Sequence, residues 1–390
     1  MKLSHRITHL TPSGSDGWEV FYRARAMMTA GVPVTELTIG EHDICTHPSI
    51  LQAMHDSAMS GHTGYAAVPG TSGLRHAVAD RIQDRTGVLT TPDNILITPG
   101  GQSALYAAHS AICNDGDTAL YIDPYYATYP GTIRGVGAVP KAIPAHAENA
   151  FQPRAVDIAA HAAGATSLLV NTPNNPTGAV YSRDTLTAIA NTCKAHDLWL
   201  ISDEVYDTQI WDGTHLSPRA LPDMADRTLV VGSMSKSHAM TGSRLGWICG
   251  PKDVIAHCIN FATHTTYGVP GYIQDAALFA LTQGAPLEDE VSAPFARRRQ
   301  ITETLLATQH IVKASPTQGT MYAMLDIRTT GLSGINFANR LLDTHHIATM
   351  PGESFGVAAA GHIRVAMTID DATYTSALQT LLKFAADLAA

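Results

Sequence analysis

The sequence predicts an α/β fold, in which helices flank a mostly parallel sheet in a large domain and a smaller α+β domain accompanies it. Three observations predict this fold class. Short apolar runs recur between residues 94 and 250, segments with helical character separate these runs, and the pattern changes past about residue 285. Continuous apolar runs are typical of strands buried on both faces, and their alternation with helices indicates a parallel sheet covered by helices.

Residues 46–284 are expected to form the large domain. Its predicted strands are NILITPG, TALYIDP, SLLVNTP, LWLISDEVY, TLVVGSMSK and RLGWICG. Between them, GQSALYAAHSAI and SRDTLTAIANTCKAHD are predicted to be helices. RLGWICG follows TLVVGSMSK too closely for a helical crossover, so this strand is expected to run antiparallel.

Residues 1–45 and 285–390 are expected to form the small domain. PFARRRQITETLLATQ predicts a long charged helix, in which Arg299 and Glu303 have the spacing of an i,i+4 pair, and TMYAMLDIR and HIRVAMTI predict strands. The arginine triplet has two interpretations, a nucleic-acid patch or a solvated helix face. Because consecutive residues fan around a helix, the solvated face is the preferred prediction.

Composition restricts the classes of protein to which the chain can belong. The 390 residues are 45% hydrophobic and 15% charged, with a formal net charge of −9, which is typical of a globular protein with a large core. This modest acidic balance gives no support for nucleic-acid or anionic-membrane binding. The N-terminus lacks the apolar stretch of a secretory signal and no apolar run approaches membrane-spanning length, so a cytoplasmic location is expected.

Cysteine and histidine patterns predict neither a disulfide framework nor a metal site. The five cysteines include no Cys-x-x-Cys pair, which indicates reduced and mostly buried thiols. Nineteen histidines invite a metal hypothesis, but none of the pairs considered has the His-x-x-x-His spacing that places two imidazoles on one helical face. The histidines considered are His42, His47, His55, His62, His345 and His346.

Small or polar residues follow five of the predicted strands, where open α/β sheets bind their ligands. These segments are TPGGQSAL, PYYATYP, TPNNPTG, SDEVY and SMSK, the last with TGSR shortly after it. Two glycines that open a helix leave backbone N–H groups free for a phosphate, although a tight turn also explains them. Asp203, at the end of a buried strand, requires a cationic or hydrogen-bonding partner, unless it caps a helix.

One small molecule, pyridoxal 5′-phosphate (PLP), matches all of these groups. The glycines, Ser233 and Arg244 suit its phosphate, and a tyrosine suits its aromatic ring. A carboxylate suits the ring nitrogen, and Lys236 suits the aldehyde.

RGVGAVP contains half of a dinucleotide-binding fingerprint, but it lacks the third glycine and leads into a strand, so a turn is predicted there.

The same segments resemble those of a known family. NTPNNPTGAVY, SDEVY and SMSKSHAMTGSRLGW occur in the order found in class I/II aminotransferases of the fold-type I PLP-dependent transferases, and the resemblance extends from LTIGEHD to GHIRVAMT. It implies the PLP-dependent transferase fold type I and PLP as cofactor. The family commonly has GEPDF where this chain has His42 and Ile44; His42 is either a substrate-side group or, as we favour, a loop histidine.

The resemblance implies a role for each matching residue. Lys236 would hold the cofactor as a Schiff base and move the proton between substrate Cα and cofactor C4′. Asp203 would pair with the ring nitrogen, while Asn175 and Tyr206 would bond the ring oxygen. The other implied cofactor contacts are Tyr126 on the ring and Gly101, Gln102, Ser233 and Arg244 at the phosphate.

Substrate binding and assembly are implied in the same way. Arg364 would bind the substrate α-carboxylate, a task suited to a planar guanidinium, with help from Gly40 and Asn175. Tyr65 matches a tyrosine that reaches the phosphate of the neighbouring subunit, and residues 265–267 carry a weaker match of this kind. A homodimer with shared active sites is therefore implied.

The implied activity is transfer of an amino group between an L-amino acid and a 2-oxo acid by a ping-pong mechanism. A C–S β-lyase on the same scaffold is the main alternative, because fold does not fix the reaction. A non-catalytic PLP-binding regulatory module would carry a basic DNA-binding domain first, and the resemblance begins too near residue 1 to expect one. No second arginine of the dicarboxylate-specific kind is identified, so aspartate is not favoured as donor, and donor, acceptor and pathway stay open.

Overall fold

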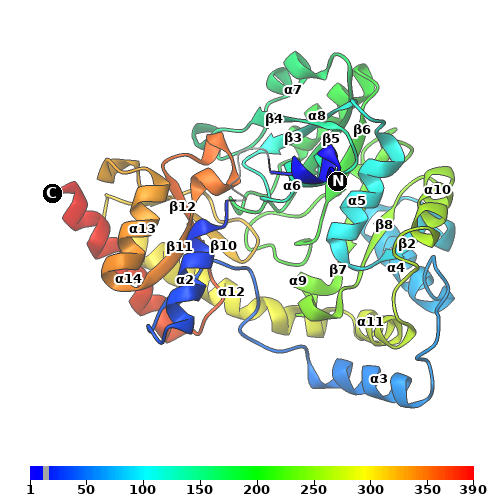
Figure 1. Cartoon of the computed structure of the whole chain (residues 1–390), viewed down its shortest axis with the longest axis horizontal. Helices are drawn as coiled ribbons and strands as arrows, with labels where there is room; N and C mark the ends of the chain where they lie inside the picture. The colour runs from blue at the N-terminus through cyan, green and yellow to red at the C-terminus, as the bar shows by residue number, and fades with distance from the viewer. Residues whose placement is uncertain (12–16) are drawn as a thin grey trace.

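The computed structural model describes residues 1–11 and 17–390, which contain two sheets. The larger sheet has seven strands, and its helices lie around the sheet in Figure 1. In spatial order the strands are β2 (Ile95–Thr98), β8 (Gly246–Cys249), β7 (Thr228–Ser233), β6 (Trp199–Asp203), β5 (Ala165–Asn171), β3 (Thr118–Asp123) and β4 (Val139–Pro144). Only β8 runs antiparallel to both of its neighbours, so the prediction for RLGWICG is confirmed.

Helices cover both faces of this sheet, which explains why its strands are continuously apolar. Leu168 and Val170 of β5 pack in one hydrophobic cluster with α7 and α8, whereas Leu169 packs in another with α5, α6 and α10. The helices of this part are α3 (Pro48–Met59), α4 (Ser72–Thr86), α5 (Gly100–Ile112), α6 (Tyr129–Gly135), α7 (Ala155–Ala162), α8 (Arg183–Ala195), α9 (Met234–Ser237), α10 (Lys252–Thr263) and α11 (Gly271–Gln283). The two helices predicted from sequence are α5 and α8.

The smaller sheet has five strands, and its two predicted strands are β10 and β12. Its spatial order is β1 (Thr35–Leu37), β11 (Ile347–Pro351), β12 (His362–Ala366), β10 (Tyr322–Asp326) and β9 (Lys313–Ala314). Its helices are α2 (Glu19–Thr29), α12 (Ala285–Leu306), α13 (Gly334–His345) and α14 (Asp371–Ala389). Short helices elsewhere are α1 (His5–Thr8), η1 (Pro92–Asn94), η2 (Ala147–Asn149), η3 (Pro218–Ala220), η4 (Thr241–Ser243), η5 (Arg328–Thr330), η6 (Gly352–Phe355) and η7 (Val357–Ala359).

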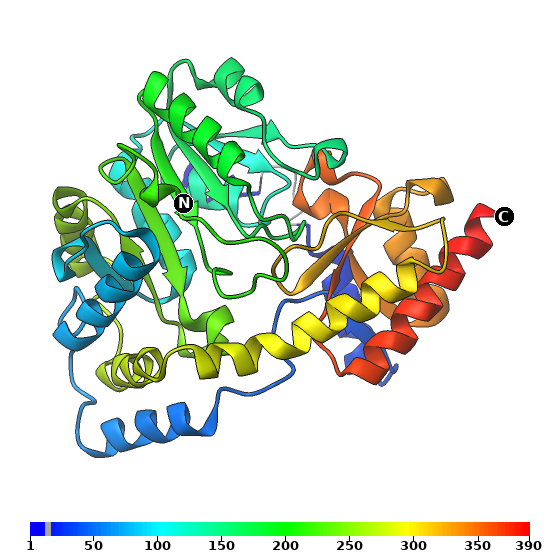
Figure 2. The same ribbon diagram turned by 180° about the vertical axis from the view of Figure 1, so that it is seen from behind.

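The predicted boundaries at residues 45 and 284 stay a prediction. All strands of the larger sheet lie between them in sequence, and all strands of the smaller sheet lie outside them. Helix α12, yellow in Figure 2, begins next to the larger sheet's helices and extends along the part that holds the smaller sheet.

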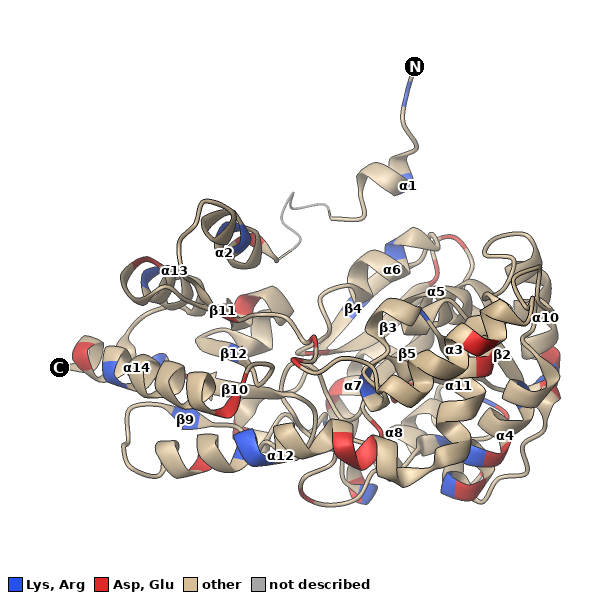
Figure 3. Ribbon diagram, turned by 90° about the horizontal axis from the view of Figure 1, so that it is seen from below, with Lys and Arg blue, Asp and Glu red and all other residues tan. Residues whose placement is uncertain are grey.

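The arginine triplet on α12 is only partly solvated, which corrects the sequence prediction. The expected Arg299–Glu303 pair forms, with 2.9 Å between nitrogen and oxygen, and Figure 3 shows basic and acidic segments side by side on this helix. The Arg298 side chain, however, is only 4% exposed and pairs with Asp43 and Asp371 at 2.6 and 2.8 Å. One of three consecutive helical residues faces inward here because the helix packs on other elements.

Thiols and histidines form no metal centre in the part of the chain that the structure describes. No group of three or more His, Cys, Asp or Glu side chains there is arranged to hold a metal ion. His5 and His9 do have the His-x-x-x-His spacing that the sequence prediction overlooked, and their rings stack 3.7 Å apart. Cys193, Cys249 and Cys258 are buried, as expected for most of the thiols. Among the described residues, no helix has both the length and the apolarity needed to cross a membrane.

Candidate active site

A cavity of about 290 Å³ lies at the carboxyl ends of the central strands of the larger sheet. β5, β6 and β7 are adjacent and parallel, and the register pairs Asn171 with Asp203, so the residues at and after these strand ends meet at one edge. The N-terminus of α5 and residues of the smaller sheet complete the wall. Except for Tyr65, the predicted site residues all line this cavity: Gly40, Gly101, Gln102, Tyr126, Asn175, Asp203, Tyr206, Ser233, Lys236, Arg244 and Arg364.

Lys236 projects from α9 into this cavity without an acidic partner in the described chain. Its ammonium donates a hydrogen bond to the Gly40 carbonyl, and burial lowers its pKa. Its own backbone carbonyl accepts a 3.2 Å bond from Gln209 Nε2 and lies 3.1 Å from His42 Nε2. The lysine backbone is therefore held by two side chains, while its amine reaches the cavity and has only a neutral carbonyl as its hydrogen-bond partner among the described residues. A lysine that loses charge readily is suited to act as a nucleophile and a base.

His42 lies behind the lysine rather than among the residues that line the cavity. Its ring packs at 5.4 Å, edge to face, on Phe295, and burial lowers its pKa to about 4. The neutral imidazole therefore serves as a packed hydrogen-bonding group at neutral pH.

Asp203 is a buried carboxylate with no cation beside it among the described residues. It accepts a 2.6 Å hydrogen bond from the Tyr129 hydroxyl and a weaker one from the Val205 N–H, at 3.3 Å. Burial raises its pKa to about 6, although both bonds act in the opposite direction. The residues after it form a turn, so the helix-cap alternative is wrong. A positively charged ligand atom would stabilise this carboxylate.

The N-terminus of α5 and Arg244 lie together in the wall of the cavity and form a cationic cradle. Gly100 has φ +80°, and a Cβ built on it would lie 2.4 Å from Arg244 Nη2, so only glycine allows this close approach. Ser233 caps α9, accepting a 3.1 Å bond from the Ser235 N–H. Arg244 donates to the Thr241 carbonyl at 2.8 Å and has no acidic partner in the described part of the chain. Free amides and an unpaired guanidinium suit a phosphate.

Arg364 is a nearly fully buried cation, 1% exposed, with no carboxylate beside it in the described chain. Its guanidinium carbon lies 4.2 Å from the centre of the Tyr322 ring and 4.3 Å from that of Phe355. One nitrogen donates to Asn175 Oδ1 at 2.9 Å, another donates to the Thr38 carbonyl, and Nε is buried with no hydrogen-bond partner among the described residues. Burial lowers its pKa. A buried cation paired only with neutral oxygens suits an anionic ligand.

Comparisons with known proteins agree with this chemistry. A family model described as "Aminotransferase class I and II" matches residues 32–381. The chain belongs to this aminotransferase family. It is 39% identical to an arginine–pyruvate transaminase of Pseudomonas aeruginosa, over 100% of this chain and 99% of that one, and 33% identical to an aspartate/prephenate aminotransferase of Thermus thermophilus, over 97% of each. The structure of aspartate aminotransferase from Thermus thermophilus with maleate covers 98% of this chain and 99% of its own, with 31% identity and a TM-score of 0.92.

The predicted fold class, PLP-dependent fold type I, and the predicted aminotransferase activity are thus confirmed, and PLP is the cofactor of this aminotransferase. The cavity fits that cofactor: it offers a lysine for the aldehyde, a carboxylate without a cation for the ring nitrogen, and a cationic cradle for the phosphate.

Several residues of this aminotransferase site were missed in the sequence. Tyr129 stands three residues after Tyr126, and helical spacing within PYYATYP was the signal that could have indicated it. Tyr322 reaches the cavity from β10, and nothing in its local sequence indicates this. The other unpredicted lining residues are Trp18, Ile39, Glu41, Leu105, Asn171, Val205, Ser235 and Thr241.

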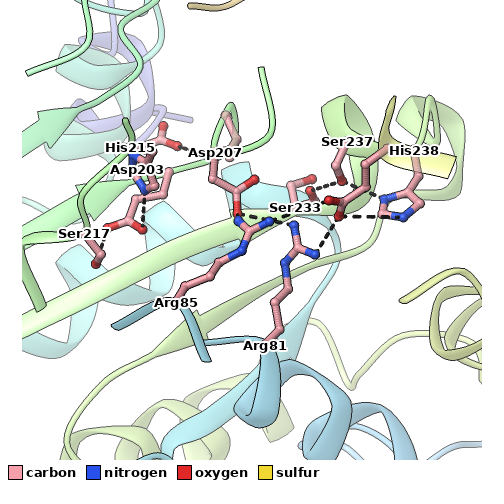
Figure 4. Close-up of polar contacts among 12 residues, drawn as sticks. Arg81, Arg85, Asp203, Asp207, His215, Ser217, Ser233, Ser237 and His238 are labelled. Carbon is pink, nitrogen blue, oxygen red and sulfur yellow. Dashed lines mark hydrogen bonds and ion pairs between the residues drawn. The ribbon is translucent and has the colours of Figure 1, made fainter. Parts of the chain in front are cut away.

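The turn after β6 carries side chains to two opposite sides, and a buried polar network holds the side away from the cavity (Figure 4). Asp203 and Tyr206 line the active-site cavity, whereas Glu204 and Asp207 line a second cavity of about 350 Å³. Glu204 accepts a 2.7 Å bond from Ser217 and lies 3.1 Å from His215 Nε2.

Two arginines of α4 hold the other carboxylate of this turn. Asp207 pairs with both Arg81 and Arg85, and these two arginines also pair with Glu288 of α12. Burial raises the pKa of Asp207 and the two arginines lower it, and the resulting pKa lies below the usual value. This carboxylate is therefore ionised at neutral pH. The turn that presents Asp203 and Tyr206 is therefore fixed from behind by charges on α4 and α12.

Tyr65 lies outside the cavity within a single chain. It is 92% exposed and contacts Tyr267 edge to face, with ring centres 5.3 Å apart. Residues 265–267 accordingly share this exposed surface with Tyr65.

Proposed function

We propose that Lys236 is the residue that binds the cofactor covalently and then transfers the proton at substrate Cα. One observation carries this proposal: its buried amine, with a lowered pKa, lines the same cavity as the cationic cradle and the Asp203 carboxylate. PLP, when bound, supplies a ring that withdraws electrons from the substrate Cα. A lysine that is readily neutral at that point can accept the Cα proton.

The side chains other than Lys236 hold the cofactor in one orientation. Asp203 holds the ring nitrogen in its positive form, Asn175 and Tyr206 bond the ring oxygen, and Tyr126 packs on the ring. The phosphate is held by the Gly101 and Gln102 amides, Ser233 and Arg244. The lining of the cavity supports these assignments because one cavity holds the cation, the carboxylate and the amine that the cofactor requires.

The substrate α-carboxylate binds to Arg364, with Gly40 and Asn175 beside it. The amino-acid donor and the 2-oxo-acid acceptor each carry a carboxylate at this position. The same arginine can therefore bind the substrate in both halves of a ping-pong cycle. Lys236, Arg244 and Arg364 are the cationic residues among those that line the cavity, and each already has a role. Among the described residues, this chain adds no further cation to its own cavity for a distal carboxylate, so a donor other than aspartate is favoured unless a second subunit supplies that cation. The name of the Pseudomonas relative makes arginine the first donor, and pyruvate the first acceptor, to examine.

Assembly as a homodimer is part of the same proposal. The exposure of Tyr65 supports it, because an aromatic side chain beside Tyr267 on the surface suits a contact with a second subunit. Sedimentation of the purified protein would give the dimer mass, and a monomer that turns over at the full rate would contradict a shared site. A cytoplasmic location stays a prediction from the sequence.

The experiment for the activity is a visible absorption spectrum with PLP before and after single L-amino acids are added. We expect the band of lysine-bound cofactor to disappear with the correct donor and to return with a 2-oxo acid. Release of pyruvate and ammonia without an amino acceptor would instead establish the β-lyase alternative. A band that no amino acid changes would favour the non-catalytic module.

A further inference from the structure

Tyr322, the first residue of β10, has no role in the function proposed above. It nevertheless contacts both a proposed cofactor-binding residue and a proposed substrate-binding residue. It is 3% exposed and reaches the active-site cavity from the smaller sheet. Its side chain has two separate contacts. Its hydroxyl is hydrogen-bonded to Tyr206, the residue that we propose to bond the cofactor ring oxygen. Its ring packs against Arg364, the residue that we propose to bind the substrate carboxylate.

The hydroxyl contact is direct and tightly enclosed. The Tyr206 hydroxyl donates to the Tyr322 hydroxyl across 3.2 Å. A Cβ built on Gly40 would lie 1.8 Å from the same Tyr322 oxygen, so the backbone of residue 40 packs on the hydroxyl and leaves it little freedom. The absence of a side chain at position 40 is therefore explained by the position of this one oxygen.

The ring contact holds the guanidinium in place. Arg364 lies between the Tyr322 and Phe355 rings, 4.2 and 4.3 Å from their centres, which fixes the plane in which its N–H groups point. Its bond to Asn175 Oδ1 then fixes its rotation within that plane. Tyr322 thus touches the groups that we assign to cofactor and to substrate.

We propose that Tyr322 is a positioning residue that acts on the cofactor contact through Tyr206 and on the substrate contact through Arg364. The inference rests on the function proposed above. A hydroxyl both donates and accepts, so when Tyr206 gives its proton to the cofactor ring oxygen, the Tyr322 proton is available for the Tyr206 oxygen. This chain of two hydrogen bonds makes Tyr206 a stronger donor to the ring oxygen.

Charged and titratable groups around the two hydroxyls decide which measurement is informative. Those that interact with one or both hydroxyl groups are Lys236 on α9, Arg364 on β12, Tyr126 and Tyr129. Glu41 and Arg244 act in turn on Lys236, and Asp203 acts on the other two tyrosines. Tyr322→Phe removes one oxygen and leaves all of these in place. A change in the protonation of lysine-bound cofactor can then be attributed to the hydroxyl pair.

The test compares Tyr322→Phe, Tyr206→Phe and the double variant in the PLP-loaded enzyme. The observable is the pH midpoint of the visible absorption change of lysine-bound cofactor. A weaker donor leaves more negative charge on the ring oxygen, which holds the proton on the Lys236 nitrogen, so the midpoint rises. We expect a rise of about half a pH unit for Tyr322→Phe, a larger rise for Tyr206→Phe, and no further rise in the double variant.

A second variant separates the two contacts. Tyr322→Leu removes the ring as well, and we expect the donor KM to rise about tenfold, whereas Tyr322→Phe leaves it within about twofold. An unchanged pH midpoint in Tyr322→Phe would overturn the inference. So would a shift caused by Tyr322→Phe that is equally large in the wild type and in the Tyr206→Phe background. Wild type without any lysine-bound band would overturn the proposed function instead. Circular dichroism and bound PLP per chain confirm that each variant is folded.

Discussion

At the scale of single residues, Asp203 determines how the site responds to pH before the cofactor binds. Burial raises its pKa to about 6, so the folded chain holds this proton more tightly than the unfolded chain does. The stability that this group contributes is present below its unfolded pKa near 4 and is lost as the pH rises through about 6. The bond from Tyr129 limits the loss but does not remove it.

Asp203→Asn should remove that pH dependence. We expect the cofactor-free wild type to lose about 2 kcal/mol of unfolding free energy between pH 4 and pH 7 relative to the variant. Urea denaturation at both pH values measures the difference. PLP should suppress the loss in wild type, because a positive ring nitrogen beside Asp203 stabilises the ionised form. Parallel pH curves for the two proteins would contradict this account.

Strand ends in the sequence indicated the residues that follow a strand, and the family resemblance indicated Gly40 and Arg364, but neither indicated Tyr322. Asp203, Ser233 and Lys236 could be assigned because the carboxyl ends of parallel strands share an edge. Tyr322 could not, because no motif marks it and its contact with Arg364, more than forty residues away in sequence, forms only in the folded chain.

At the scale of elements, the turn after β6 needs charges from two helices to keep its position. Asp207 is 16% exposed and pairs with Arg81 and Arg85 of α4, which also contact Glu288 of α12. Removing the Asp207 charge leaves the two arginines to share the single carboxylate of Glu288, a change that costs several kcal/mol, unlike loss of an exposed pair.

Asp207→Asn should therefore lower the unfolding free energy by about 3 kcal/mol and weaken PLP binding, because the same turn presents Asp203 and Tyr206. Lys252→Ala is the matched control. It breaks an exposed 3.5 Å pair with Asp93 and should change stability by less than about 0.5 kcal/mol. Denaturant unfolding and PLP titration measure both effects. Equal stabilities of the two variants would contradict the role of the network.

Helix α12 shows the limit of pattern-based prediction at this scale. Its charged triplet predicts three solvated arginines, yet Arg298 turns inward to Asp43 and Asp371. Nothing in the local sequence indicates which of three charged neighbours is buried, because the partner Asp43 lies 255 residues away.

Two substitutions on α12 test this difference. Arg298→Met should lower the unfolding free energy by about 3 kcal/mol, whereas Arg297→Met, whose side chain is 55% exposed, should change it by less than about 0.5 kcal/mol. Arginine and methionine have similar helix propensities, so the difference in thermal unfolding between the two variants reports the loss of their ion pairs. A stable Arg298→Met variant would show that the inward pair contributes little.

At the scale of the whole molecule, the two sheets contribute different parts of one site. The larger sheet supplies the lysine, the carboxylate and the phosphate cradle, while Tyr322 and Arg364 come from the smaller one. Alternating apolar runs and helices predicted both fold class and strand direction. The spatial order of the strands and the way the smaller sheet faces the larger depend on long-range packing that no local pattern encodes.

The most direct test of the account is the location of the covalent bond to the cofactor. The PLP-loaded protein is reduced with borohydride and digested, and the peptides are identified by mass spectrometry. We predict one pyridoxyl-modified peptide, with the modification on Lys236, and none in Lys236→Ala. Modification of a different lysine, or an unmodified Lys236 in protein that turns over, would contradict the central claim.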